Sequence, residues 1–205
     1  MAARGHDSLV GLQVFASLMA SPRCLGRLDA PSRRLWMTRV AEHMRSGAET
    51  DRVVALDSAC CAMRIGCPAL VAPSAAAATS TNSLLCEQLV DADMVEAAVT
   101  CLKSAHSKVQ EAAFWFVRVL VCQDHAWGLK LVLGSPAIVQ ALLDERACHG
   151  PAANDARRLA SVAASAHPQV SSLADAATVG SLARAARSAQ VPSQARLAEP
   201  EAMML

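Results

Sequence analysis

KVQEAAFWFVRVLVCQ, residues 108–123, is the stretch that decides the fold. Its apolar side chains recur at helical spacing and cover well over half of the circumference, so we predict a helix buried on more than one side. An inner helix of a layered helical stack is enclosed in this way. A narrow polar stripe remains, and it carries Lys108, Glu111 and Arg118 together with Trp115.

The composition of the whole chain agrees with a helical fold. Of its 205 residues, 53% are apolar, which is enough to bury a sizeable core, and tyrosine is absent. Alanine occurs in runs and β-branched residues rarely cluster, which favours helices over sheets. We therefore predict an all-α protein.

Further amphipathic helices are predicted on both sides of residues 108–123. Apolar side chains recur at helical spacing in each, and proline, glycine or a capping residue separates most of them. The predicted helices are 9–20, 31–46, 51–66, 84–90, 95–102, 136–149 and 152–166, with a weaker stripe at 179–186.

Neighbouring helices joined by short polar turns form antiparallel hairpins, and the hairpins resemble one another. Leu102 and Leu143 each lie near the end of a first helix and are 41 residues apart, within the period of armadillo and HEAT repeats. Met44, the earlier equivalent, precedes Leu102 by 58 residues. We predict a right-handed armadillo/HEAT-like helical solenoid.

The domain organisation follows from this fold and from two segments of low apolar content. Residues 73–82, PSAAAATSTN, contain little that could be buried, and we expect an exposed loop there. Residues 1–189 are predicted to form a single helical-repeat domain. Residues 190–205 are predicted to be a flexible tail.

Charge and apolar runs argue against nucleic acid and membranes as partners. The net charge is +1, so no global field attracts a polyanion. The longest apolar runs are about half of what a bilayer crossing needs. The basic pairs Arg33-Arg34 and Arg157-Arg158 lie beside apolar residues in helical register, and we expect them on solvated helix faces.

The sequence contains no catalytic or metal-binding motif. Phosphate-binding loops, nucleophile elbows, HExxH and calcium loops are absent, and none of the eight cysteines forms a CxxC pair. Free buried thiols in a reducing compartment fit the cysteine pattern best. We expect no enzyme, cofactor, metal or small-molecule substrate; an enzyme that uses Cys60 or Cys61 is the weakest hypothesis.

A helical solenoid works through its surface, so we expect its partner to be a protein. The expected partner-binding residues are those of the polar stripe, Lys108, Glu111, Trp115 and Arg118, because Trp and Arg dominate binding hot spots. In the alternative interpretation, Trp115 packs against the neighbouring hairpin.

One stretch resembles a known family. It contains Val109 to Ala113 and the pattern W-x-x-K-L-x-x-x-S-P-x-x-V from Trp127 to Val139, with Asp144 beyond. This is similar to the last repeats of the 26S proteasome non-ATPase regulatory subunit 5 family. Looser similarity extends the resemblance over about residues 14–187. Family members are longer at the amino terminus, so we expect a fragment or a shortened relative.

The resemblance implies an assembly chaperone for the base of the proteasome regulatory particle. Such a chaperone binds carboxy-terminal domains of the proteasomal ATPase subunits in the cytoplasm, and in the nucleus as well, and is absent from the finished particle. The alternative function is a generic armadillo/HEAT adaptor with another protein client.

Overall fold

The structure is a computed structural model that describes residues 3–25, 27–63, 88–90, 92–123 and 126–187. Within these residues it contains helices and turns and no strand, so the prediction of an all-helical protein is confirmed. The elements are α1 (Ala3–Met19), α2 (Pro22–Leu25), α3 (Ala30–Ser46), α4 (Glu49–Met63), α6 (Met94–Leu102), α7 (Ser107–Val121), α8 (Trp127–Gly134), α9 (Pro136–Leu143), the 3-10 helix η2 (Glu145–Ala147), α10 (Pro151–Ala166), α11 (Val170–Leu173) and α12 (Ala176–Arg187).

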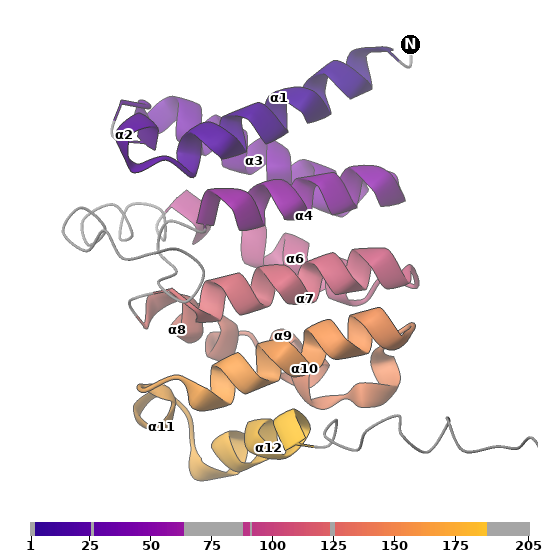
Figure 1. The fold of residues 1–205 in the computed structure, drawn as a ribbon, viewed down its shortest axis with the longest axis vertical. Coiled ribbons are helices and arrows are strands. Elements are labelled where there is room, and N and C mark those ends of the chain that lie inside the picture. Colours follow the sequence, from indigo (N-terminus) through magenta and orange to yellow (C-terminus); the bar gives the residue numbers. More distant parts are fainter. Residues whose placement is uncertain (1–2, 26, 64–87, 91, 124–125, 188–205) are drawn as a thin grey trace, which may run out of the picture.

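The helices stack in two rows along the long axis of the molecule (Figure 1). In the front row, α1 packs on α4, α4 on α7, α7 on α10 and α10 on α12. Behind it, α3 packs on α6 and α6 on α9. The rows are joined because α3 also contacts α4, α6 contacts α7 and α9 contacts α10.

Helix boundaries follow capping chemistry that is visible in the sequence. Asp29 accepts a hydrogen bond from the Ser32 N–H at 2.6 Å and caps α3. Proline occupies the first turn of α3, α9 and α10, where its missing N–H leaves no hydrogen bond unmade. The predicted starts near Pro31 and Pro136 are therefore confirmed. The helix predicted for residues 136–149 is too long, because α9 ends at Leu143 and Pro151 begins the next helix, α10.

The core runs through the contact between the two rows, and α7 lies in its middle. Ten of the fifteen residues of α7 are buried, because α4, α6, α8 and α10 all pack against it. Phe114 and Phe116 are both nearly inaccessible although they lie on different sides of the helix. The prediction that residues 108–123 are buried on more than one side is confirmed.

Two short helices lie in segments where no helix was predicted. The chain after Ser21 forms the single turn α2, and residues 127–134 form α8. Gly128 explains why α8 can sit so close to α7: a Cβ atom at this position would lie 1.8 Å from the Leu120 carbonyl oxygen. Gly128 is therefore a packing contact between the two helices.

The prediction that both basic pairs are solvated is wrong for Arg157. Its side chain is 1% exposed, because Ala153, Ala156 and Ala160 turn the small face of α10 inward and Arg157 lies on that same side. Its Nη1 donates to the Leu142 carbonyl at 2.7 Å. The negative end of α9 thus receives a buried cation.

Arg33 also departs from the prediction, although less strongly. It is half-buried, and its Nε donates to the Gln88 side chain at 3.3 Å while Nη1 donates to the Leu28 carbonyl. Arg34 and Arg158 are the more exposed members of the two pairs.

The three positions compared in the sequence each lie near the end of a helix, but Met44 and Leu102 are buried whereas Leu143 is half-buried. Met44, Leu102 and Leu143 lie in the last turns of α3, α6 and α9, which form the rear row. The predicted loop 73–82 and the predicted tail 190–205 lie outside the described residues.

Candidate protein-binding surface

The polar stripe of α7 is the first candidate surface. Lys108 is exposed, whereas Glu111, Trp115 and Arg118 are half-buried. The structure brings Trp115 and Arg118 together, with the guanidinium carbon 5.0 Å from the centre of the indole ring. This cation–π contact holds the two side chains as one unit. Trp115 also packs against the buried core, so it is both a core contact and a surface residue.

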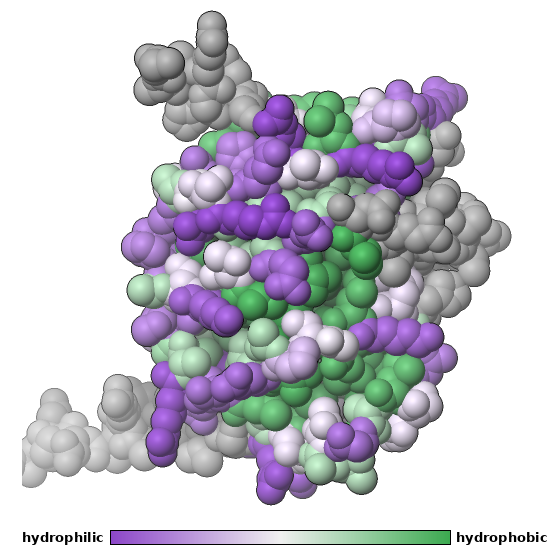
Figure 2. Space-filling model, turned by 180° about the vertical axis from the view of Figure 1, so that it is seen from behind, coloured by the Kyte–Doolittle hydropathy of each residue, from purple (hydrophilic) through white to green (hydrophobic). Residues whose placement is uncertain are grey.

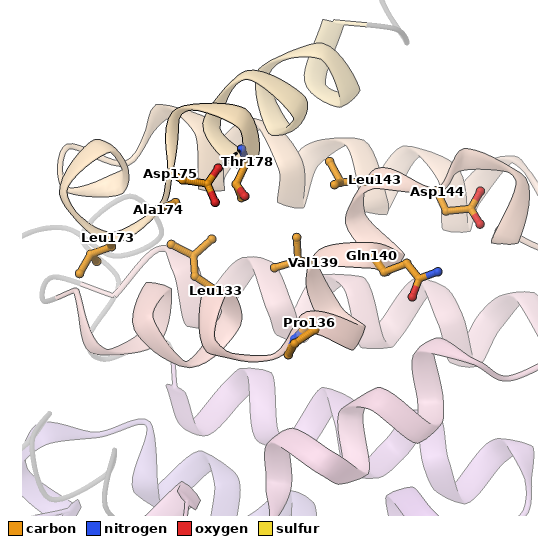
Figure 3. A pocket seen from close by; sticks show the side chains of 10 residues that line it. All are labelled: Leu133, Pro136, Val139, Gln140, Leu143, Asp144, Leu173, Ala174, Asp175 and Thr178. Carbon is orange, nitrogen blue, oxygen red and sulfur yellow. Dashed lines mark hydrogen bonds between the residues drawn. The ribbon is translucent and has the colours of Figure 1, made fainter.

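A groove of about 750 Å³ is the second candidate surface (Figure 3). We call it the α9–α12 groove. One wall comes from the end of α8 and from α9, and the other from the end of α11, the following turn and the start of α12. Its lining consists of Leu133, Pro136, Val139, Gln140, Leu143, Asp144, Leu173, Ala174, Asp175 and Thr178.

The groove combines an apolar lining with two carboxylates. Asp175 lies on the α12 wall across from Leu133 and Val139, and Asp144 lies beyond Leu143 at the end of α9 (Figure 3). Hydrogen bonds from Thr178, the backbone N–H first, hold the pKa of the Asp175 carboxyl below its usual range. Asp175 is therefore ionised at neutral pH. None of the ten lining residues carries a positive charge.

A smaller groove of about 350 Å³ lies on the other side of α9. It is lined partly by Leu102, Lys103, Gln110 and His149, and it shares Gln140 and Asp144 with the α9–α12 groove. The two grooves therefore meet along one edge of α9. The rear face of the molecule shows apolar side chains gathered in its lower half, where α8 and α9 lie (Figure 2).

Gln110 fixes the shape of the smaller groove. Its side chain is 2% exposed and makes three hydrogen bonds to backbone groups. Nε2 donates to the carbonyls of Leu102 at 3.0 Å and Ala147 at 2.9 Å, and Oε1 accepts from the His149 N–H at 2.8 Å. One amide thus holds the end of α6, α7 and the chain after η2 together.

Two of the described thiols, Cys101 and Cys148, are poorly suited to nucleophilic chemistry. Burial raises the pKa of the Cys101 thiol to about 11, and Arg52 opposes this only in part. Burial also raises the pKa of Cys148, against the influence of Arg157. Because the thiolate is the nucleophile, a raised pKa makes both thiols less reactive at neutral pH than an ordinary cysteine. Among the described residues, no cluster of three or more His, Cys, Asp or Glu side chains could hold a metal ion.

Sequence reasoning missed the α9–α12 groove. Pro136 lies where a helix start was predicted, and Val139 and Leu143, in the same predicted helix, are half-buried and line the groove. A signal was present: Ile138 and Leu142 take the buried face, so the adjacent Val139 and Leu143 must lie on a different side of the helix. The second wall could not be predicted, because residues 173–178 are distant from α9 in the sequence and come close to it only in the folded structure.

No family model, no curated protein and no solved structure matches the chain. Across the part of the chain that the structure describes, none of the helices is both long enough and apolar enough to span a bilayer.

Proposed function

We propose that the chain is a protein-binding scaffold, a right-handed armadillo/HEAT-type solenoid that acts as an assembly chaperone of the proteasome regulatory-particle base. Its clients are the proteasomal ATPase subunits, which it binds in the cytoplasm and in the nucleus without catalysis or a cofactor. The observation that carries the proposal is the stack of two helical rows, whose surface offers the α7 stripe and the α9–α12 groove.

The stack supports a solenoid because most helices contact only their nearest neighbours. In the front row, α7 packs between α4 and α10, and α10 packs between α7 and α12. Stacking of this kind is the defining feature of helical-repeat proteins, which bind their partners along extended surfaces. The similar places of Met44, Leu102 and Leu143 in the rear row agree with a repeated hairpin.

The choice of client depends on the resemblance in residues 127–139. The structure gives several of these residues a role at the candidate surface. Pro136 begins α9, Val139 lines the groove, and Asp144, which also belongs to the resemblance, lies at its end. Three of the residues that carry the resemblance therefore line a surface suited to binding.

An affinity purification tests the client. The tagged full chain is used as bait in a native lysate, and the recovered proteins are quantified by mass spectrometry against the tag alone. We expect enrichment of proteasomal ATPase subunits without the assembled regulatory particle, since the proposed chaperone leaves before assembly is complete.

Two other outcomes are informative. Specific enrichment of other proteins, with no ATPase subunit among them, would contradict the chaperone function and favour a generic armadillo/HEAT adaptor. Recovery of nothing above the tag would contradict a protein-binding scaffold of either kind.

A further inference from the structure

We propose that the α9–α12 groove binds a protein segment in which one or more Lys or Arg residues stand among apolar side chains. The inference rests on the proposed function as a protein binder, and it adds the chemistry of the segment and the residues that select it.

The apolar part of the segment is selected by the walls. Leu133, Val139 and Leu143 come from one wall and Leu173 from the other, and all four are partly open to solvent in the groove. Covering them removes apolar surface from water, which is the main favourable contribution to association. Figure 3 shows these side chains on both sides of the space that a segment would enter.

The basic part is selected by Asp144 and Asp175. The Arg146 N–H donates to Oδ1 of Asp144 at 3.0 Å, and the Thr178 N–H donates to Oδ1 of Asp175 at 2.7 Å. Asp175 also accepts from the Thr178 hydroxyl and the Ala177 N–H. A carboxylate has about four acceptor positions, so both groups still retain an acceptor for an incoming cation, Asp144 more than Asp175. No described ion pair involves either residue, and no lining residue supplies a compensating positive charge.

The same charges and the open shape exclude other classes of ligand. Two carboxylates repel the phosphates of nucleic acids and of anionic lipids. A small molecule is normally enclosed over most of its surface, whereas this groove opens widely to solvent. A segment of a larger protein needs no enclosure, because the rest of the partner covers the opening.

Fluorescence anisotropy with the full chain and three labelled synthetic peptides tests the proposal. The first peptide has twelve residues in alternating pairs of leucine and lysine. In the second, serine replaces leucine, and in the third, glutamate replaces lysine. We expect the leucine/lysine peptide to bind at least about tenfold more tightly than either of the others.

The variant Asp144→Asn/Asp175→Asn removes both charges and keeps both backbone hydrogen bonds, because an amide oxygen accepts as a carboxylate does. We expect it to bind the leucine/lysine peptide at least about tenfold more weakly. Glu96→Gln/Asp155→Asn is the matched control. It removes two charges from exposed residues outside the groove and should bind the peptide as the native chain does.

Equal binding by the groove variant and the native chain would overturn the proposal, as would equal affinity for the serine/lysine peptide or no binding of the leucine/lysine peptide. The affinity purification distinguishes this failure from that of the proposed function. If the groove variant still recovered ATPase subunits, the proposed chaperone function would stand and the groove would not be the binding site. If the native chain bound the leucine/lysine peptide but recovered no ATPase subunit, the groove would be supported as a binding site and the chaperone function contradicted.

Discussion

Gln110 shows how a polar residue in an apolar helix can be a structural necessity. Its hydrogen bonds connect Leu102, eight residues earlier in the chain, with Ala147 and His149, which lie 37 and 39 residues later. Helical spacing places Gln110 beside the predicted apolar face, but nothing in the sequence says that three backbone groups converge on it.

We predict that Gln110→Leu lowers the free energy of unfolding by about 2–4 kcal/mol, because buried or partly buried backbone groups lose their partner while the volume is kept. Chemical denaturation followed by circular dichroism measures this. Gln13→Leu, at an exposed position of α1, is the control and should change the stability by less than about 0.5 kcal/mol. Equal effects of the two substitutions would show that the three hydrogen bonds contribute little.

Trp115 and Arg118 offer a test of the α7 stripe. We predict that Trp115→Ala combined with Arg118→Ala weakens client binding by about tenfold or more and leaves the helical circular dichroism signal nearly intact. Binding is measured with the protein recovered by affinity purification. Leu35→Ala with Arg39→Ala removes an apolar and a basic side chain from exposed positions of α3 and serves as the control. Loss of helicity in parallel with binding would mean that Trp115 acts mainly in the core.

At the scale of the elements, two glycines within helices should respond in opposite ways to the same substitution. Gly128→Ala places a methyl group against the Leu120 backbone, which cannot yield like a side chain, so we predict a loss of about 1–3 kcal/mol. Gly180→Ala in α12 meets no atom within 4 Å and should add up to about 1 kcal/mol, because alanine favours a helix. Melting temperatures of both variants check this. A stabilising Gly128→Ala would contradict the close packing of α8 on α7.

The carboxylate caps of α3 and α12 should make stability fall in acid. Hydrogen bonds from the Ser32 and Thr178 backbone N–H groups lower the pKa of Asp29 and Asp175 in the folded state. Their contribution is therefore complete above the unfolded pKa of about 3.9 and is lost as the pH falls through the lower folded pKa.

Asp29→Asn/Asp175→Asn isolates this charge effect, since asparagine also caps a helix. The native chain should exceed the variant in melting temperature by a constant amount between pH 7 and about pH 5, and the difference should shrink below about pH 4. A difference that does not change with pH would contradict the prediction.

The elements show how far sequence reasoning reaches. Proline and glycine near their boundaries made α3 and α10 predictable, and the apolar spacing of residues 108–123 made α7 predictable, since these signals act locally. The short α8 was not predicted, and only its contact with α7 explains the glycine at position 128. Long-range contacts limit the prediction of the groove as well. The apolar pattern indicates the partly exposed apolar residues of α9, but nothing in the sequence indicates that α12 lies opposite them.

At the scale of the whole molecule, stacking should make stability uneven along the chain. Neighbours surround α7, whereas α12 packs mainly against α10 and α9. We predict that amide protons of α7 exchange at least about tenfold more slowly than those of α12. Hydrogen exchange with residue-level mass spectrometry measures the gradient. A uniform rate across both helices would indicate a single cooperative unit.

The two candidate surfaces belong to different parts of the stack. The stripe lies on α7 in the front row, and the groove is formed by α9 of the rear row with α11 and α12. A client that occupied both would have to extend around the molecule. Comparing the stripe variant with the groove variant therefore shows whether the two surfaces serve one partner.

The Leu142 carbonyl accepts hydrogen bonds from Arg157 and from Ser161, so the final turn of α9 is completed by the helix that follows it. If the helices up to α9 were transferred to another protein without α10, the Leu142 carbonyl would lose both hydrogen-bond partners. The smallest unit of this stack that could be transferred to a designed helical-repeat protein must therefore include α10 together with α9.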